Sequence, residues 1–238
     1  MKQKRTGAKT AATKRRWQNP ANQRHSKLKI YGLIMGIVAI AVIIVAAVVI
    51  LNQPQANLPV QPAEVSLDKS EGDPQAPVVV VEYADFQCPY CRQFATGPER
   101  QLKTDYVDSG QVRFVFRHMA FIGDESRQAA QASECANAQG RFWAYHDQLF
   151  AAQTGENVGD FSADHLQQFA VDLGLDSPQF NQCLDSSQYQ TKVQQEVSEA
   201  QRLGVNSTPT LFVNGQRIRQ GSDYQTLQAA IEAALARK

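Results

Sequence analysis

Cysteine and histidine are scarce in this 238-residue sequence, which contains four of each. Their spacing excludes a four-ligand zinc ribbon, because there is only one C-x-x-C pair and no second pair of cysteines or histidines lies at ligand spacing. No internal repeat is apparent. The single pair, Cys88 and Cys91, therefore has to be interpreted from its surroundings, with a permanent disulfide or a zinc half-site as the alternatives to a redox centre.

Acidic residues are absent from the first 51 positions, although 23 occur after them. The same segment contains ten of the 24 Lys and Arg residues, all of them before residue 30. Such a tail, which includes Trp17, is compatible with a nucleic-acid-binding arm. The positive-inside rule is the simpler explanation, so we predict that residues 1–29 form a basic cytoplasmic tail and bind no nucleic acid.

Charged residues are also absent from residues 30–51, a run of 22 mostly apolar residues. As a helix this run is about 33 Å long, enough to cross a hydrocarbon core of ~30 Å. A cleavable signal peptide is the alternative, but its apolar core is usually ~7 to 15 residues long and is followed by an A-x-A-like site, which residues 52–55 do not supply. We predict an uncleaved transmembrane anchor with the rest of the chain outside the cytoplasm.

Large apolar residues are few in residues 52–75, a segment rich in proline and glutamine. This composition predicts a semi-extended spacer rather than a packed element. Residues 76–238 are then expected to form one folded domain, which is long enough to bury a hydrophobic core.

The C-x-x-C pair follows a strand signal and precedes a helix signal. Residues 76–86 contain a β-branched apolar run typical of a buried parallel strand. Residues 92–108 have apolar residues at helical spacing, with an expected kink at Gly97-Pro98. Cys88 is therefore expected at the helix N-terminus, with Pro89 in the first helical position.

This placement has a chemical consequence for the two thiols. The partial positive charge of a helix N-terminus favours a thiolate and lowers a cysteine pKa by one to several units from ~8.5. Cys88 is therefore predicted to be the nucleophile. Cys91, one turn further into the helix, is expected to be more buried and to act as the resolving cysteine.

The remaining segments indicate an α/β domain with a helical insertion. Residues 111–117 alternate with period two and predict a second strand. An all-helical insertion of four or five helices is expected at about 120–204. Residues 210–218 predict a hairpin around Asn214-Gly215, and an amphipathic helix follows.

With these elements in this order, the chain resembles the DsbA-like thiol:disulfide oxidoreductases of the thioredoxin superfamily, in their membrane-anchored bacterial type. The resemblance extends from about Pro77 to Leu235, and its most specific segments are residues 82–91, 140–147 and 207–215. It implies a thioredoxin fold, preceded here by the predicted transmembrane helix, and a place at the bacterial cytoplasmic membrane.

The resemblance also implies roles for individual residues. Pro209 matches a proline that is cis and lies against the catalytic disulfide; an ordinary trans proline is the alternative. Thr208, Pro209, Pro89 and Tyr90 are then expected to bind the substrate peptide. Glu82 matches a buried carboxylate that relays a proton to Cys91, whereas a strand-end glutamate reaching solvent is the structural alternative.

Cys135 and Cys183 lie within the predicted insertion. The resemblance implies that they form a structural disulfide, with free buried thiols as the alternative. His118 and His146 are expected to be structural histidines rather than catalytic ones. The large aromatic residues of the insertion are expected to be core residues: Phe142, Trp143 and Phe150.

The function expected from the resemblance is disulfide formation in exported, cysteine-containing polypeptides, with a membrane redox partner that re-oxidises the dithiol. A reductase or isomerase is the first alternative, because threonine at position 208 is frequent in similar isomerases. A redox-silent binding module or chaperone is the second. Tyr90 stands where the strongest oxidants have histidine, so a less extreme redox potential is expected. Neither a cofactor nor a metal ion is expected.

Overall fold

The computed structural model describes residues 35, 39–45 and 66–237. The chain divides into two units, residues 1–56 and 57–238. In the first unit, residues 39–45 are helical and their side chains are exposed; the predicted tail (1–29) and the rest of the predicted anchor (30–51), apart from Met35, lie outside the described residues. Within the described part of the chain, no helix has both the length and the apolar character needed to cross a bilayer.

A five-stranded mixed sheet with the strand order β1-β3-β2-β4-β5 forms the centre of the second unit. Its strands are β1 (Ser70–Glu71), β2 (Val78–Ala84), β3 (Val112–His118), β4 (Thr210–Val213) and β5 (Gln216–Ile218). Strands β2 and β3 are parallel, and the other neighbouring pairs are antiparallel. Four consecutive valines open β2, the middle strand of the sheet, as expected for a strand that is covered on both faces.

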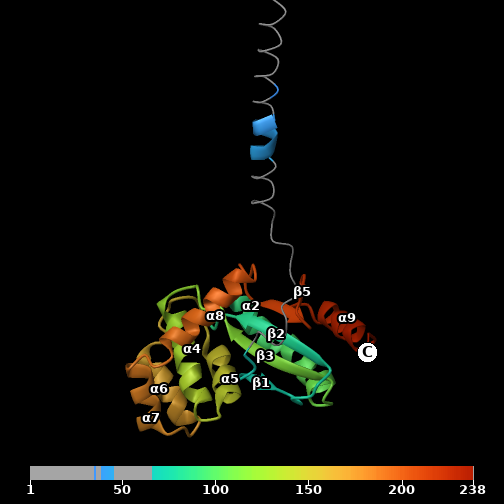
Figure 1. Ribbon diagram of the computed structural model, residues 1–238. Coiled ribbons are helices and arrows are strands. Elements are labelled where there is room, and N and C mark those ends of the chain that lie inside the picture. Colours follow the sequence, from blue (N-terminus) through green and yellow to red (C-terminus); the bar gives the residue numbers. More distant parts are fainter. Residues whose placement is uncertain (1–34, 36–38, 46–65, 238) are drawn as a thin grey trace, which may run out of the picture. The chain divides into compact units, whose positions relative to one another are not determined.

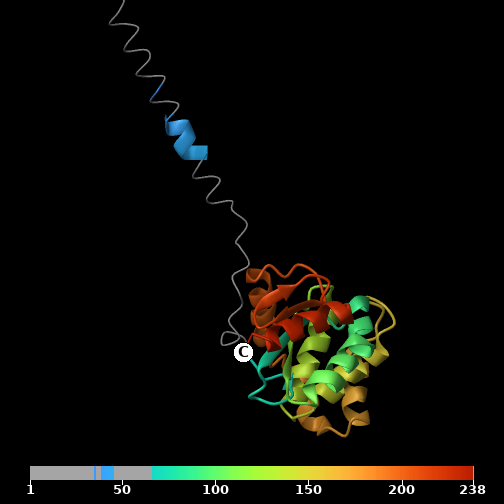
Figure 2. The same ribbon diagram turned by 90° about the vertical axis from the view of Figure 1, so that its right-hand side faces the viewer.

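The helices described in the second unit occupy three places in the sequence. The connection from β2 to β3 contains α2 (Pro89–Thr96), α3 (Pro98–Leu102) and the π-helix η2 (Lys103–Val107). The insertion between β3 and β4 contains α4 (Asp124–Asn137), α5 (Phe142–Ala152), α6 (Ala163–Asp172), α7 (Ser177–Asp185) and α8 (Gln190–Arg202), and α9 (Tyr224–Leu235) ends the fold. Helices α4, α5, α6 and α7 gather beside one end of the sheet, away from α9 (Figures 1 and 2). The thioredoxin fold with an all-helical insertion, expected from the sequence, is confirmed.

Two layers of side chains cover the sheet. On one face, Phe116 packs with Cys91 of α2 and with aromatic residues of α5. On the other face, Tyr83 and Val115 pack against Ala200 of α8. The active-site helix α2 and the insertion helix α5 therefore share one core with the centre of the sheet.

The folded domain begins earlier than the sequence analysis placed it. Ser70 and Glu71, assigned there to the spacer 52–75, pair with Val115 and Phe114 as an edge strand. The reason is physical: a polar strand of two residues has no apolar alternation by which it can be recognised. The π-helix η2 was also not predicted, because Gly97-Pro98 indicated only a kink; α2 ends at Thr96 and α3 begins at Pro98.

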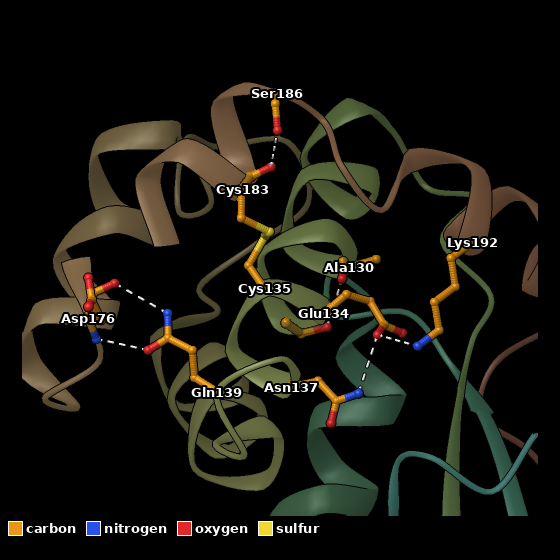
Figure 3. Close-up of a disulfide and its surroundings, with 10 residues drawn as sticks. Ala130, Glu134, Cys135, Asn137, Gln139, Asp176, Cys183, Ser186 and Lys192 are labelled. Carbon is orange, nitrogen blue, oxygen red and sulfur yellow. Dashed lines mark hydrogen bonds and ion pairs between the residues drawn. A yellow bond between two sulfur atoms is a disulfide. The ribbon is translucent and has the colours of Figure 1, made fainter. Parts of the chain in front are cut away.

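Cys135 on α4 and Cys183 on α7 are joined by a disulfide across 48 residues (Figure 3). Both cysteines are buried. In the chain-entropy model, closing a loop of this length stabilises a fold by about 4 kcal/mol. The bond therefore fastens two helices of the insertion to each other and leaves Cys88 and Cys91 as the free thiols.

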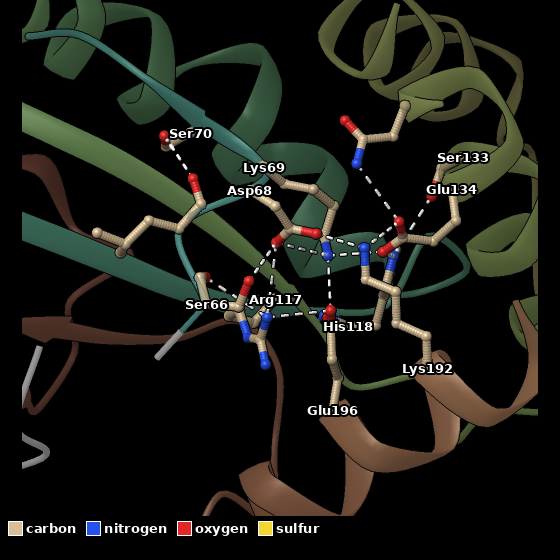
Figure 4. A network of polar contacts seen from close by, with 12 residues as sticks. Ser66, Asp68, Lys69, Ser70, Arg117, His118, Ser133, Glu134, Lys192 and Glu196 are labelled. Carbon is tan, nitrogen blue, oxygen red and sulfur yellow. Dashed lines mark hydrogen bonds and ion pairs between the residues drawn. The ribbon is translucent and has the colours of Figure 1, made fainter. Parts of the chain in front are cut away.

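A buried network of charges connects the sheet to the insertion (Figure 4). The Lys69 ammonium lies 2.6 Å from a carboxylate oxygen of Glu134 on α4 and 2.6 Å from one of Glu196 on α8. Arg117 of β3 contacts the same Glu196 oxygen at 3.0 Å. Burial opposes ionisation of Glu134, but hydrogen bonding and the charges of His118 and Lys69 hold the pKa of this carboxyl well below its ordinary value. The network thus joins the β1 region, β3, α4 and α8.

Candidate active site

Cys88 occupies the N-cap position of α2, where its backbone is extended (φ −72°, ψ 120°), and Pro89 begins the helix. Cys91 lies one turn further along and is completely buried, whereas Cys88 retains 5% exposure. Proline suits the first helical position because its fixed φ is already helical and its missing N–H is not needed there. The local sequence therefore places one thiol at the surface and the other beneath it.

The second side of the site is the loop before β4. The peptide bond between Thr208 and Pro209 is cis. The Cys88 thiol donates a hydrogen bond to the carbonyl oxygen of Thr208 at an Sγ to O distance of 3.4 Å. The two segments that the sequence analysis assigned to the site, 120 residues apart in the chain, are thus in direct contact.

The two thiols differ in acidity. A hydrogen bond from the Cys91 thiol, helped by the backbone N–H groups of Tyr90 and Cys91, lowers the pKa of Cys88 to about 6 in spite of its partial burial. Burial, followed by the hydrogen bond to Cys88 and the nearby Glu82, raises the pKa of Cys91 well above its ordinary value. At neutral pH the pair therefore holds a thiolate at Cys88 and a thiol at Cys91, the division of charge that dithiol chemistry requires.

Glu82 projects from the centre of β2 into the interior and is completely buried. Burial, and then the negative charge of Glu99, raise the pKa of the Glu82 carboxyl well above its ordinary value. Neither carboxyl oxygen has a hydrogen-bond partner. The solvent-exposed alternative for this residue is excluded, and burial favours the neutral form of its carboxyl group.

Sequence reasoning missed the residues that order the active-site loop. The buried Asp85 carboxylate accepts hydrogen bonds from the backbone N–H groups of Gln87, Phe121 and Ile122 at 2.9 to 3.1 Å. The Gln153 side chain of the insertion donates to the carbonyl of Cys88 at 3.2 Å. The signal for Asp85 was present, since an acidic residue at the end of an apolar strand needs partners, but which partners it finds depends on the tertiary structure.

An open hollow of about 520 Å³ lies beside Cys88. Its lining includes Cys88, Pro89, Tyr90, Phe121, Ile122 and Thr208. Tyr90 is 66% exposed and Phe121 is 47% exposed. The hollow therefore places two exposed aromatic rings, together with polar residues such as Glu156 and Asn206, next to the reactive sulfur.

Two groups of described side chains bring possible metal-ligand atoms together, but each already contains an ammonium group. One consists of His118, Glu134 and Glu196, and Lys69 lies 2.6 Å from both of its carboxylates. The other consists of Glu99, His146 and Asp147, and the Lys103 ammonium lies 2.8 Å from Glu99. Because lysine supplies the positive charge in each group, we assign neither as a metal centre.

Comparison with known proteins agrees with this geometry. The sequence model of the family described as Thioredoxin matches residues 67–233. The structure of BdbD from Bacillus subtilis superposes with a TM-score of 0.67 and 29% sequence identity, covering 70% of this chain and 92% of that one. DsbA2 of Pseudomonas aeruginosa superposes with a TM-score of 0.56 and 26% identity, covering 71% and 94%. The chain is a DsbA-like member of the thioredoxin superfamily.

A curated relative carries a different name. The chain is 38% identical over 177 residues to the Na(+)/H(+) antiporter NhaA 3 of Salinispora tropica, a match that covers 74% of this chain and 26% of that protein. The chain thus spans about a quarter of the length of the curated relatives that it matches. The fold and the C-x-x-C pair of this DsbA-like chain are those of the protein-disulfide oxidoreductases.

Proposed function

We propose that this DsbA-like protein forms disulfides in exported polypeptides through exchange at Cys88 and Cys91. The single observation that supports this most strongly is the difference in acidity between the two thiols. A nucleophilic cysteine with a pKa of about 6 is a stable thiolate and a good leaving group, which favours the reduced enzyme and makes its disulfide an oxidant. This value lies between thioredoxin, at about 7, and DsbA, at about 3.5.

The exchange has two steps. A substrate thiolate attacks Sγ of Cys88 in the oxidised enzyme, a mixed disulfide forms, and Cys91 leaves with the electron pair of the broken S–S bond. A second substrate thiolate then attacks the substrate sulfur of the mixed disulfide and releases Cys88 as a thiolate. The substrate loses two electrons, and the enzyme gains them as a dithiol, with Glu82 donating the proton that the Cys91 thiolate takes up.

The hollow beside Cys88 supports an extended peptide as the substrate. Thr208 precedes a cis proline at the start of β4, so its backbone is available to pair with a peptide strand. Tyr90 and Phe121 offer exposed aromatic rings for apolar side chains of that peptide. We therefore assign Pro89, Tyr90, Thr208 and Pro209 to substrate binding.

The charge pattern and the second disulfide support a location outside the cytoplasm. Ten basic residues precede the apolar run 30–51, which we propose as a single transmembrane anchor with its N-terminus in the cytoplasm. The spacer expected after this run is proposed to connect the anchor to the folded domain. The disulfide between Cys135 and Cys183 is of the kind that persists in an oxidising compartment. A membrane partner with a reducible disulfide or quinone is proposed to re-oxidise the dithiol.

The redox potential tests the direction of electron flow. Equilibrating the protein with reduced and oxidised glutathione is expected to yield roughly −120 to −200 mV, and a value near roughly −270 mV contradicts an oxidase and favours the reductase or isomerase alternative. The Cys88→Ser variant is expected to lose all oxidation of a reduced substrate protein. If it retains turnover, only a redox-silent binding role remains.

A further inference from the structure

Four buried polar atoms on three side chains of the same domain have no hydrogen-bond partner: both carboxyl oxygens of Glu82, Oε2 of Glu99 and Nε2 of His146. Leaving a buried polar atom unpaired costs about 1 to 3 kcal/mol, so a cluster of them calls for an explanation other than stability. His146 belongs to residues 140–147, one of the most specific segments of the resemblance, and disulfide exchange at Cys88 and Cys91 does not by itself give this segment a role. These side chains come from β2, α3 and α5.

The cluster is continuous in space. Phe116 is the register partner of Glu82 on the neighbouring parallel strand, so the two side chains lie side by side on the same face of the sheet. The His146 ring packs against Phe116 with a centroid distance of 5.3 Å. Nε2 of His146 in turn lies 3.8 Å from Oε2 of Glu99. Glu82 and His146 therefore both lie beside Phe116, and Glu99, which lies beside His146, is near enough to Glu82 for its charge to raise the pKa of the Glu82 carboxyl.

The cluster also reaches the surface. Nδ1 of His146 lies 2.9 Å from Oδ1 of Asp147, whose side chain is 67% exposed. This carboxylate contact assigns the proton of the neutral imidazole to Nδ1 and leaves Nε2 as a free acceptor facing Glu99. Lys103 holds the other oxygen of Glu99 at 2.8 Å, so that Oε2 stays directed to the histidine.

We propose that Glu99 and His146 conduct protons between Glu82 and the exposed Asp147 whenever Cys91 gains or loses its proton. The proposal deepens the function proposed above and rests on it, because it requires Cys91 to cycle between thiol and disulfide. Glu99 and His146 act through Glu82 and do not touch the substrate.

The protons balance over one catalytic cycle. On re-oxidation, the Cys88 thiolate attacks the partner's disulfide and forms a mixed disulfide with one partner sulfur, while the other partner sulfur leaves with the electron pair. Cys91 then gives its proton to the Glu82 carboxyl group and attacks Sγ of Cys88, and the remaining partner sulfur leaves as a thiolate. As Glu82 takes up this proton it passes its own to Glu99, Glu99 passes one to Nε2 of His146, and Nδ1 releases one to Asp147 and water. This leaves the imidazole protonated at Nε2. When the next substrate is oxidised, Nε2 returns a proton inward through Glu99 to Glu82 and Cys91, and Nδ1 regains one from Asp147.

The histidine thus alternates between two tautomers without turning its ring. In the structure both active-site cysteines are free thiols, and the Nδ1–H tautomer assigned from the Asp147 contact is the one that accepts an outgoing proton at Nε2. The charged groups around the path are consistent with it. The charges of Glu99, Lys103 and Cys88 act on the pKa of Glu82, and the charge of Glu82 acts on that of Cys91. The charges of Lys103 and Arg100 help to lower the pKa of Asp147.

The first test uses His146→Gln and Glu99→Gln in the full-length protein. Each is expected to slow thiol–disulfide exchange about tenfold at pH 7 and to shift the pH–rate profile. This loss is smaller than the ~10²- to 10⁴-fold rate enhancement that a general acid or base contributes when it contacts the reacting group directly. The pKa of the Cys88 thiol is expected to stay at about 6. His118→Gln is the matched control, because this histidine is also buried and packs on Phe116 but contacts Glu134 instead; its pH–rate profile is expected to be unchanged.

The second test needs no substitution at the cluster. ¹⁵N NMR of the imidazole nitrogens in the oxidised and reduced protein is expected to show His146 protonated at Nε2 in the first state and at Nδ1 in the second. One tautomer in both states, or a wild-type pH–rate profile in His146→Gln, overturns the proton path. The Cys88→Ser variant tests disulfide exchange independently of the proton path. If this variant is inactive while one of the two results above overturns the proton path, the proposed function still holds.

Discussion

Cys88 and Cys91 are separated by two residues, yet their environments move their acidities in opposite directions. The N-cap position and the Cys91 thiol favour a thiolate at Cys88, and burial disfavours one at Cys91. The lowered pKa stabilises the reduced protein; this stabilisation is complete above the ordinary thiol pKa and is lost as the pH falls through about 6.

The titration of Cys88 is expected to be visible in both rate and potential. Its alkylation by iodoacetamide should reach half its maximal rate near pH 6, rather than near ~8.5 as for a free cysteine. The redox potential should fall by about 30 mV per pH unit above pH 6, where reduction takes up one proton, and by about twice that below pH 6, where it takes up two. A single slope from pH 4 to 8 would contradict the assignment of Cys88 as the acidic thiol.

At the scale of elements, the active-site helix and the insertion depend on each other. Helix α2 packs on α5 in one core, and Gln153, just after α5, donates to the carbonyl of Cys88. The insertion is held to the sheet by the buried Lys69, whose ammonium lies between carboxylates of α4 and α8. A partly buried ion pair at Lys192 adds a further contact to Glu134.

Substitution of Lys69 by methionine is expected to destabilise the domain by about 3 to 5 kcal/mol, because Glu134 and Glu196 then lose their shared buried cation. Urea unfolding followed by circular dichroism measures this loss. The control is Lys192→Met: its side chain is 30% exposed, so a loss of about 1 kcal/mol or less is expected. Equal losses of unfolding free energy in the two variants would contradict a larger contribution to stability from the buried Lys69 contacts than from those of Lys192.

At the scale of the whole molecule, a basic segment and an apolar run precede a folded domain whose sheet starts at Ser70. The asymmetry of charge between the two ends of the chain is consistent with two different environments. The proposed anchor would keep the reactive cysteine close to polypeptides that leave the membrane and to the proposed membrane partner.

The proposed topology predicts the result of protease treatment of intact spheroplasts. A tag at the C-terminus is expected to be digested by added protease, while a tag at the N-terminus is protected until the membrane is opened by detergent. The protein is expected to sediment with membranes and to resist extraction by carbonate. Recovery of the intact protein in the soluble fraction would contradict the anchor.

Much of the fold follows from local patterns in the sequence. The valines of β2, the turn at Asn214-Gly215 and the helical insertion were predicted because propensity and periodicity are properties of neighbouring residues. The C-x-x-C pair after a strand and the proline in the first helical position determined where the reactive thiol lies. The short strand Ser70–Glu71 was missed because its pairing with β3 is a long-range contact.

The sequence by itself determined the dithiol, its helix and the order of the elements around it, since each depends on residues within a few positions of one another. Only the tertiary structure decided the state of Glu82, the contact between Cys88 and Thr208, and the cluster of Glu99 with His146. Burial and charge proximity between segments many residues apart set these properties, and no local pattern encodes them. His146 shows the difference: the sequence analysis treated it as structural, and its position between Glu99 and Asp147 makes it a candidate for proton transfer.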